Sequence, residues 1–131
     1  MDKTNESAED YLERILMLQV EENNNRIHAI DIATSMGYTK ASVSIALKKL
    51  EDMGYVEVGP KQVLSLTPSG YDIASKIYER HKVIGHFFIA LGVDEETAYK
   101  DACKIEHDLS DETFEALKKV YNEKAGLEEN K

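Results

Sequence analysis

A change of hydrophobic period near Gly54 constrains the fold of this chain more than any other feature of the sequence. Before Gly54, apolar residues recur at helical spacing in two short segments, 29–36 and 39–53, which are separated by Gly37. After Gly54, residues 55–58 and 63–66 alternate in the manner of strands around the turn residues 59–62. The sequence therefore predicts two short helices joined by a glycine turn and followed directly by a β-hairpin.

This order of elements predicts a winged helix-turn-helix, in which the hairpin is the wing behind the recognition helix. Thr39 is the expected N-cap of that helix. Further helices are expected at residues 7–20, with Ser7 as N-cap, and at 68–91, capped by Thr67 and broken near Gly85. Two more are expected at 94–109 and at 110–124, the second capped by Ser110. The fold class is mainly α, with a small hairpin wing and an all-α segment for dimerisation.

The composition suits a folded protein with a modest core, since 42% of the 131 residues are apolar. The sequence contains no apolar run of the ~20 residues that a bilayer requires. The first residues are acidic where a signal peptide would be basic, so we expect a cytoplasmic protein. Cys103 is the only cysteine, which excludes a disulfide within the chain.

A net charge of −9 argues against nucleic-acid binding until its distribution is considered. Residues 1–25 hold seven acidic and two basic side chains, and residues 94–131 hold twelve acidic and six basic ones. The middle of the chain, residues 26–93, has a small excess of basic side chains. This leaves room for one basic face, while the clustered carboxylates favour either solvation or a bound cation.

The outward face of the predicted recognition helix carries side chains that suit DNA. Short hydroxyls and lysines reach phosphates or base edges, and small apolar side chains contact thymine methyl groups. Any one of these side chains could instead lie on a face of the helix that only contacts water. That alternative leaves an exposed Ile45 unexplained. The candidate DNA-binding residues are Thr39, Lys40, Ala41, Ser42, Ser44 and Lys48, together with Lys61 in the predicted turn of the wing.

A second group of residues suits a metal ion. Asp10 and Glu13 share a face of the first helix, and Cys103, Glu106 and His107 have the i, i+3, i+4 spacing that makes side chains converge on a helix. Thiolate, carboxylate and imidazole together suit a first-row transition metal. Each also has an ordinary explanation, because acidic residues are often solvated, a lone cysteine is often buried in a core, and a glutamate often pairs with a nearby lysine.

With these features in place, the sequence resembles the diphtheria-toxin-repressor and manganese-transport-regulator family of bacterial metalloregulators. The resemblance is carried by residues 8–13, 78–81, 92–96 and 103–110, in the family's order and at similar spacing. It implies a homodimer that binds a palindromic operator when Fe(II) or Mn(II) is bound. It also implies a DNA-binding domain, residues 1–70, and a helical metal-binding and dimerisation domain, residues 71–131.

The resemblance implies a ligand set residue by residue. Asp10 and Glu13 match the helix-1 carboxylates of the manganese branch, and His81 matches the family's connector histidine. Glu106 and His107 match its Glu-His pair. Cys103 departs from the manganese branch, which has glutamate there, and agrees with the iron branch. The implied metal ligands are Asp10, Glu13, His81, Cys103, Glu106 and His107.

Two further positions depart from the iron branch, whose ancillary metal site uses a glutamate and a histidine there. This chain has Gly85 and Tyr99 at those positions, so the ancillary site is not expected in its usual form. His86 is expected to be structural. The repressor controls metal-homeostasis genes in this interpretation and is not an enzyme.

The sequence also leaves room for other functions. A winged-helix regulator that is not activated by metal is the main alternative, and metal-dependent DNA affinity separates the two. A small metal hydrolase with Glu13 as base lacks an evident nucleophile with a paired base. An acidic helical adaptor would leave the serines and lysines of the recognition helix unexplained.

Overall fold

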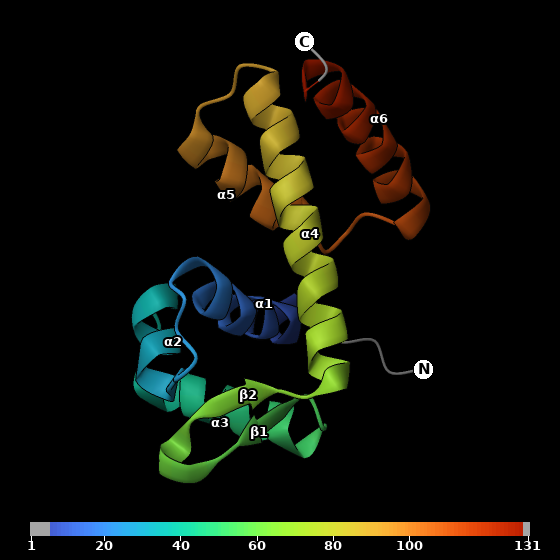
Figure 1. Ribbon diagram of the computed structural model, residues 1–131. Coiled ribbons are helices and arrows are strands. Elements are labelled where there is room, and N and C mark those ends of the chain that lie inside the picture. The colour runs from blue at the N-terminus through green and yellow to red at the C-terminus, as the bar shows by residue number, and fades with distance from the viewer. Residues whose placement is uncertain (1–5, 130–131) are drawn as a thin grey trace. The chain divides into compact units, whose positions relative to one another are not determined.

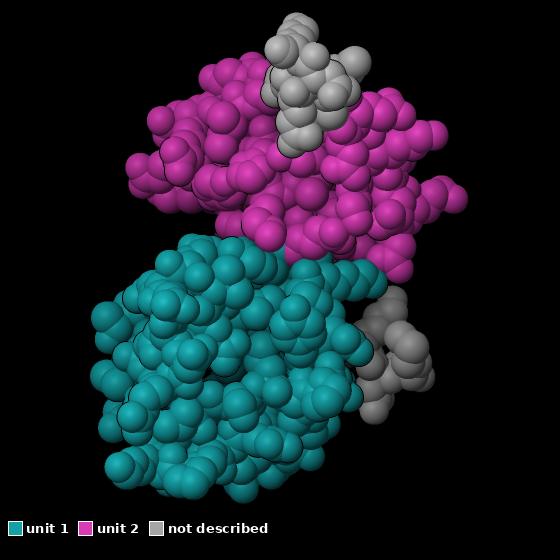
Figure 2. All heavy atoms as spheres, in the orientation of Figure 1, with its two compact units in different colours: residues 1–78 teal, residues 79–131 magenta. Residues whose placement is uncertain are grey.

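The structure, a computed structural model, describes residues 6–129, with side chains described as far as Glu123. It is mainly helical with one antiparallel hairpin, which confirms the predicted fold class (Figure 1). Two compact units divide at Tyr78 and Glu79 (Figure 2). The elements are α1 (Glu6–Glu21), α2 (Ala29–Met36), α3 (Lys40–Asp52), β1 (Val56–Val58), a 3-10 turn (Pro60–Gln62), β2 (Leu64–Leu66), α4 (Pro68–Ala90), α5 (Glu95–Ile105) and α6 (Asp111–Glu129). None of these helices is long and apolar enough to cross a bilayer.

The helix-turn-helix of unit 1 is built by local signals between α2 and α3. Gly37 ends α2 in the left-handed conformation, with φ of 73°, and its N–H donates to the carbonyl of Ala33 at 2.9 Å. Thr39 then caps α3, since its Oγ1 accepts a hydrogen bond from the Ser42 N–H at 3.1 Å. The predicted turn and cap are both confirmed.

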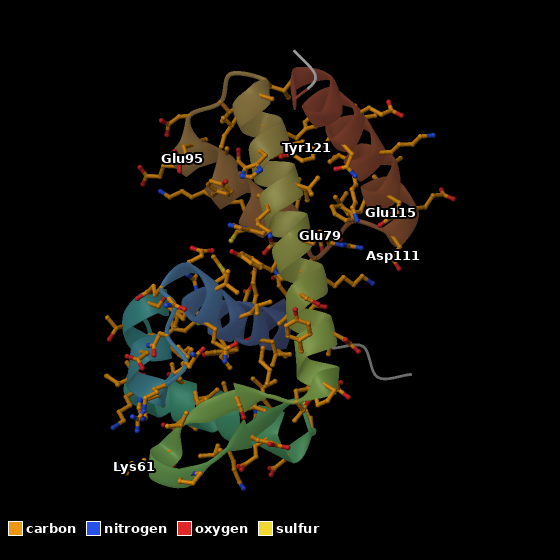
Figure 3. All side chains as sticks on the ribbon, in the orientation of Figure 1. Lys61, Glu79, Glu95, Asp111, Glu115 and Tyr121 are labelled. Carbon is orange, nitrogen blue, oxygen red and sulfur yellow. The ribbon has the colours of Figure 1, made fainter. Side chains whose placement is uncertain are left out.

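The hairpin that follows α3 pairs Val56 with Leu66 and Val58 with Leu64. The Leu64 N–H also donates to the carbonyl of Ile27 at 2.8 Å, which attaches the hairpin to the segment before α2. Lys61, inside the turn, has φ of 60° and lies at the tip of the hairpin (Figure 3). The hairpin is therefore a wing that is attached to the segment before α2 through Leu64, the first residue of β2.

The junction between the wing and α4 is held by Thr67. Its Oγ1 donates to the carbonyl of Gly54 at 2.7 Å and accepts from the Gly70 N–H at 3.1 Å, so one hydroxyl links the turn after α3 to the start of α4. A Cβ at Gly70 would overlap the carbonyl oxygen of Tyr55. Glycine is required at this position because the two backbones approach so closely.

A single apolar core fills unit 1 and fixes the orientation of α3. The inner face of α3 contributes three buried side chains, which leaves its opposite face toward solvent. The main members of this core are Leu12, Ile15, Ile27, Ile32, Val43, Leu47, Leu50, Val56, Leu64, Ala74 and Tyr78.

Unit 2 consists of the second half of α4 flanked by α5 and α6 (Figure 1). Its core contains Val83 and Ile84 from α4, Ala102 from α5 and Phe114 from α6. The expected break of α4 near Gly85 is wrong, because the helix runs unbroken to Ala90. Gly85 is buried there against the ring of Tyr99, and its missing side chain makes room for that ring.

Three predicted helix boundaries also need correction. Ser7 lies inside α1, which begins at Glu6, so Ser7 is not its N-cap. The helix expected at 94–109 ends at Ile105, and Glu106 is its C-cap residue. The last helix continues to Glu129 instead of ending near residue 124. Its predicted cap is confirmed, since Ser110 Oγ accepts from the Thr113 N–H at 3.1 Å.

Candidate DNA-binding helix and metal centre

The candidate DNA-binding side chains form an exposed surface on α3. Burial of Val43, Leu47 and Leu50 on the other face leaves these side chains outward. Ile45 is 62% exposed on the same surface, as the sequence analysis expected. The exposed candidates on or next to α3 are Thr39, Lys40, Ala41, Ser42, Ser44 and Lys48, and Lys61 is exposed on the wing.

Three of these side chains, those of Thr39, Ser42 and Lys48, are already engaged within unit 1. The Thr39 hydroxyl caps the helix and donates to Ser42 Oγ at 2.9 Å. The Nζ of Lys48 lies 3.4 Å from Asp52 Oδ1 and 3.6 Å from Glu51 Oε1. The hydrogen bond to Asp52 raises the pKa of Lys48 above its ordinary value of 10.5, so this lysine is charged but partly neutralised by its own helix.

The candidate metal ligands of unit 2 come from α4, from α5 and from the turn after α5. His81, Cys103 and Glu106 each offer a ligand atom, and these three atoms lie within 4.8 Å of one another. His81 Nδ1 is 3.1 Å from Glu106 Oε2 and 3.8 Å from Cys103 Sγ. The structure therefore brings together three of the predicted ligands, one of which, His81, came only from the family resemblance.

Glu106 is the most deeply placed member of this group, with 0% of its surface exposed. Its Oε1 is 3.5 Å from Nε2 of His107, whose side chain is 3% exposed. A carboxylate without solvent is costly unless positive or donating groups surround it, and two imidazoles do so here. His107 thus contacts the same carboxylate as His81.

Arg80, which is not among the residues predicted from the sequence, shapes the segment that carries these ligands. Its guanidinium is buried and donates to the carbonyls of Glu106 at 2.9 Å and Leu109 at 2.6 Å, and to Asp111 Oδ1 at 2.7 Å. It also lies over the ring of Phe114, 5.3 Å from its centroid. These bonds satisfy the carbonyls where α5 ends, which explains why the helix stops before residue 109.

A signal for Arg80 is present in the sequence. Residues 77, 80 and 84 lie on one face of a helix, and in this face Arg80 stands between Ile77 and Ile84. A charged side chain in an otherwise apolar stripe must be paired when the stripe is buried. That argument identifies a buried ion pair but does not identify its partners.

Asp10 and Glu13, the other predicted ligands, lie on α1 in unit 1. They are three positions apart in the sequence and therefore share one face of the helix. Asp10 is partly buried and Glu13 is 3% exposed. Buried carboxylates on a helix otherwise packed with leucine and isoleucine are uncommon unless they are paired or bind a cation.

The donors of unit 2 fit a divalent transition metal. Imidazole, thiolate and carboxylate form a mixed nitrogen, sulfur and oxygen set that Fe(II), Mn(II), Co(II) and Zn(II) all accept. The buried carboxylate of Glu106, bracketed by two imidazoles, is the observation that supports this fit.

Two family models match the chain, one over each half. The family model described as "Iron dependent repressor, N-terminal DNA binding domain" matches residues 3–64. The model described as "Iron dependent repressor, metal binding and dimerisation domain" matches residues 67–125.

Relatives extend over most of the chain. An uncharacterized HTH-type transcriptional regulator of Methanocaldococcus jannaschii is 42% identical over 120 residues, which cover 91% of this chain and 94% of that protein. The transcriptional regulator MntR of Salmonella typhimurium is 35% identical over 112 residues, covering 86% of this chain and 70% of that protein.

Solved structures share the fold. The manganese regulator SloR matches with a TM-score of 0.76 and 31% identity, over 88% of this chain and 53% of that one. The metal-dependent transcriptional regulator MtsR matches with a TM-score of 0.78 and 27% identity, with the same coverage of 88% and 53%. This chain thus spans about half the length of these two solved proteins. From the matched domains and the identities, it belongs to the iron-dependent repressor family, the family of the diphtheria toxin repressor and of MntR.

Proposed function

We propose that this protein is a cytoplasmic transcriptional repressor that binds DNA when Fe(II) or Mn(II) is bound, and that it controls metal-homeostasis genes. The observation that carries the proposal is the convergence of His81, Cys103 and Glu106 in unit 2, in the same chain as an exposed recognition helix. The similarity to the transcriptional regulator MntR and to the manganese regulator SloR supports it.

The ligand set proposed for this metal combines both units of the chain. His81, Cys103, Glu106 and His107 would supply nitrogen, sulfur and oxygen donors from unit 2. Asp10 and Glu13 on α1 would complete the set, as the family resemblance implies. A bound divalent cation supplies positive charge that neutralises these carboxylates and the thiolate. We propose a DNA-binding domain at 1–70 and a metal-binding and dimerisation domain at 71–131.

DNA recognition is proposed for the outward surface of α3 and the tip of the wing. Lys40 and Lys61 would contact phosphates, and Ser42 and Ser44 would lie nearer the bases. Thr39 would contribute from the start of the helix, Ala41 through contact with a thymine methyl, and Lys48 would contact phosphate after exchanging its intrahelical partners. A homodimer would present two such helices to a palindromic operator.

Fe(II) is the favoured metal, with Mn(II) close behind. The carboxylates suit both ions, and the thiolate of Cys103 favours Fe(II) over Mn(II). Affinity alone is a misleading criterion, because such a site binds Zn(II) more tightly than either ion. Activation of DNA binding is therefore the property to measure.

Enrichment of random DNA duplexes tests the proposal without knowledge of the operator. The purified protein is incubated anaerobically with the duplex pool in Fe(II), in Mn(II) and in excess chelator. We expect a two-fold symmetric sequence to emerge with metal and none with chelator. Glu106→Gln, which keeps the shape of the side chain but removes its charge, is the matched control and should enrich nothing. Enrichment of the same sequence in chelator would support instead a winged-helix regulator that is not activated by metal.

A further inference from the structure

The ring of Tyr99 lies against the ring of His81 in unit 2. The two ring centroids are 5.1 Å apart and the ring planes differ by 24°, which is a stacked arrangement. His81 on α4 directs its Nδ1 toward Glu106 and Cys103, at 3.1 and 3.8 Å. Tyr99 therefore covers one face of the imidazole whose nitrogen points into the candidate metal centre.

Gly85 makes this stacking possible. A Cβ built on Gly85 would overlap Cε1 of Tyr99 and would lie 2.5 Å from its Cδ1. Any side chain at this position would push the ring away from the helix. The backbone of α4 is regular through Gly85, so the glycine is used here for a close approach and not for an unusual backbone conformation.

The ring of Tyr99 also contacts a second histidine, His86. His86 lies edge-on to the Tyr99 ring, with centroids 6.0 Å apart and planes at 70°. His86 Nδ1 in turn lies 3.0 Å from the hydroxyl of Tyr121 on α6 (Figure 3). The tyrosine ring thus contacts two histidines of α4 and packs against Gly85, and this restricts its position.

We propose that Tyr99 is a positioning residue of the metal centre: seated on Gly85, its ring holds the His81 imidazole with Nδ1 directed toward Glu106 and Cys103. The proposal deepens the proposed function and rests on it. An imidazole that is free to rotate must be ordered when it ligates a metal, so a ring that is already held lowers the cost of binding. Neighbours that orient a ligating histidine typically change metal affinity by about 10- to 100-fold.

Gly85 and Tyr99 act as one unit in this proposal. Gly85→Ala should displace the ring, and Tyr99→Ala should remove it, so either change frees the imidazole of His81. Once the ring is absent, a methyl group at position 85 has nothing to displace. The two substitutions should therefore be strongly non-additive.

Co(II) binding to the full chain, without DNA, tests the proposal. Affinity is measured by titration, and the geometry at the metal is followed by the visible ligand-field bands and the thiolate-to-Co(II) band. Tyr99→Phe keeps the stacked ring and should bind Co(II) like the wild type. Tyr99→Ala and Gly85→Ala should each bind about tenfold more weakly with altered ligand-field bands. The double variant should be no weaker than Tyr99→Ala.

Tyr71→Ala is the matched control, because Tyr71 is exposed on α4 and lies in unit 1. It should leave Co(II) binding unchanged, and circular dichroism verifies that every variant is folded. If Tyr99→Ala proves unstable, Gly85→Ala is compared with Tyr99→Phe instead. Both of these variants keep an aromatic ring at position 99, and only Gly85→Ala should displace it. Wild-type affinity and spectrum in a folded Tyr99→Ala or Gly85→Ala variant would overturn the positioning role. Failure of the wild type to bind Co(II) would overturn the proposed metal function and this inference with it.

Discussion

Nδ1 of His81 lies 3.1 Å from Oε2 of Glu106, although the two residues are 25 positions apart in the sequence. The contact joins the middle of α4 to the C-cap of α5 around a carboxylate that is completely buried. Burial of this carboxylate is stable only while imidazole or metal neighbours compensate it. The candidate metal centre of unit 2 is therefore also part of the structure of that unit.

The first prediction is that Cys103 influences which metal activates DNA binding. Cys103→Glu replaces the thiolate with the hard oxygen ligand of the manganese branch and should shift activation of DNA binding toward Mn(II). Cys103→Ala should weaken activation by every metal. Both are measured as the metal concentration required for half-maximal DNA binding under anaerobic conditions. If the alanine variant responds to metal like the wild type, the thiol is not a ligand.

The second prediction separates two lysines of α3. Lys40 lies at the first turn of the helix, whereas Lys48 is paired with Glu51 and Asp52. Lys40→Ala should reduce the log–log slope of DNA affinity against salt by about one unit, since one phosphate contact is lost. Lys48→Ala should reduce it by less, because its charge is already shared with two carboxylates.

Exposed Lys100 on α5 provides a control for these slopes, since it lies in unit 2. Its replacement by alanine should leave the salt dependence of DNA binding unchanged. A slope that is the same for Lys40→Ala as for the wild type would refute the assignment of Lys40 to a phosphate.

The third prediction concerns the stability that Arg80 provides. Arg80→Met leaves the carbonyls of Glu106 and Leu109 without their donor and should lower the free energy of unfolding by about 3 kcal/mol. Asp111→Asn should cost about 1 kcal/mol or less, because the Asp111 side chain is 72% exposed and water can replace its ion pair. Urea denaturation measures both. Equal losses for the two variants would contradict this account of Arg80.

The fourth prediction is that the protein is a homodimer through unit 2. Unit 2 exposes several large apolar side chains, which are Ile89, Leu91, Ile105 and Val120. Leu91, 65% exposed, is well suited to a test: Leu91→Asp should shift the sedimentation coefficient toward that of a monomer. Val20→Asp, at a residue 58% exposed in unit 1, is the matched control and should leave the dimer intact. A wild-type monomer at micromolar concentration, with and without metal, would exclude the predicted dimer.

Much of the fold could be predicted because its signals are local. The cap at Thr39, the turn at Gly37 and the change to strand periodicity after Gly54 each depend on a few adjacent residues, and the structure confirms all three. The continuity of α4 through Gly85 could not be predicted. A glycine inside a helix weakens it by its own propensity, and only the ring of Tyr99, from another helix, explains its presence.

The candidate site, too, could be predicted from local sequence patterns only in part. The convergence of Cys103 with Glu106 follows from helical spacing, whereas His81 came from the family resemblance, because no local pattern connects it to them. The bonds of Arg80 join residues 26 to 31 positions apart, so the sequence could indicate a paired charge without indicating its partners.

Equilibrium binding of the enriched duplex, followed by fluorescence anisotropy, tests the central claim most directly. The dissociation constant of the purified protein is measured anaerobically with Fe(II), with Mn(II) and with excess chelator at one fixed salt concentration. The account predicts that Fe(II) or Mn(II) tightens binding by about 10- to 100-fold over chelator, the size of a typical allosteric coupling. An equal dissociation constant in chelator and in both metals would contradict it.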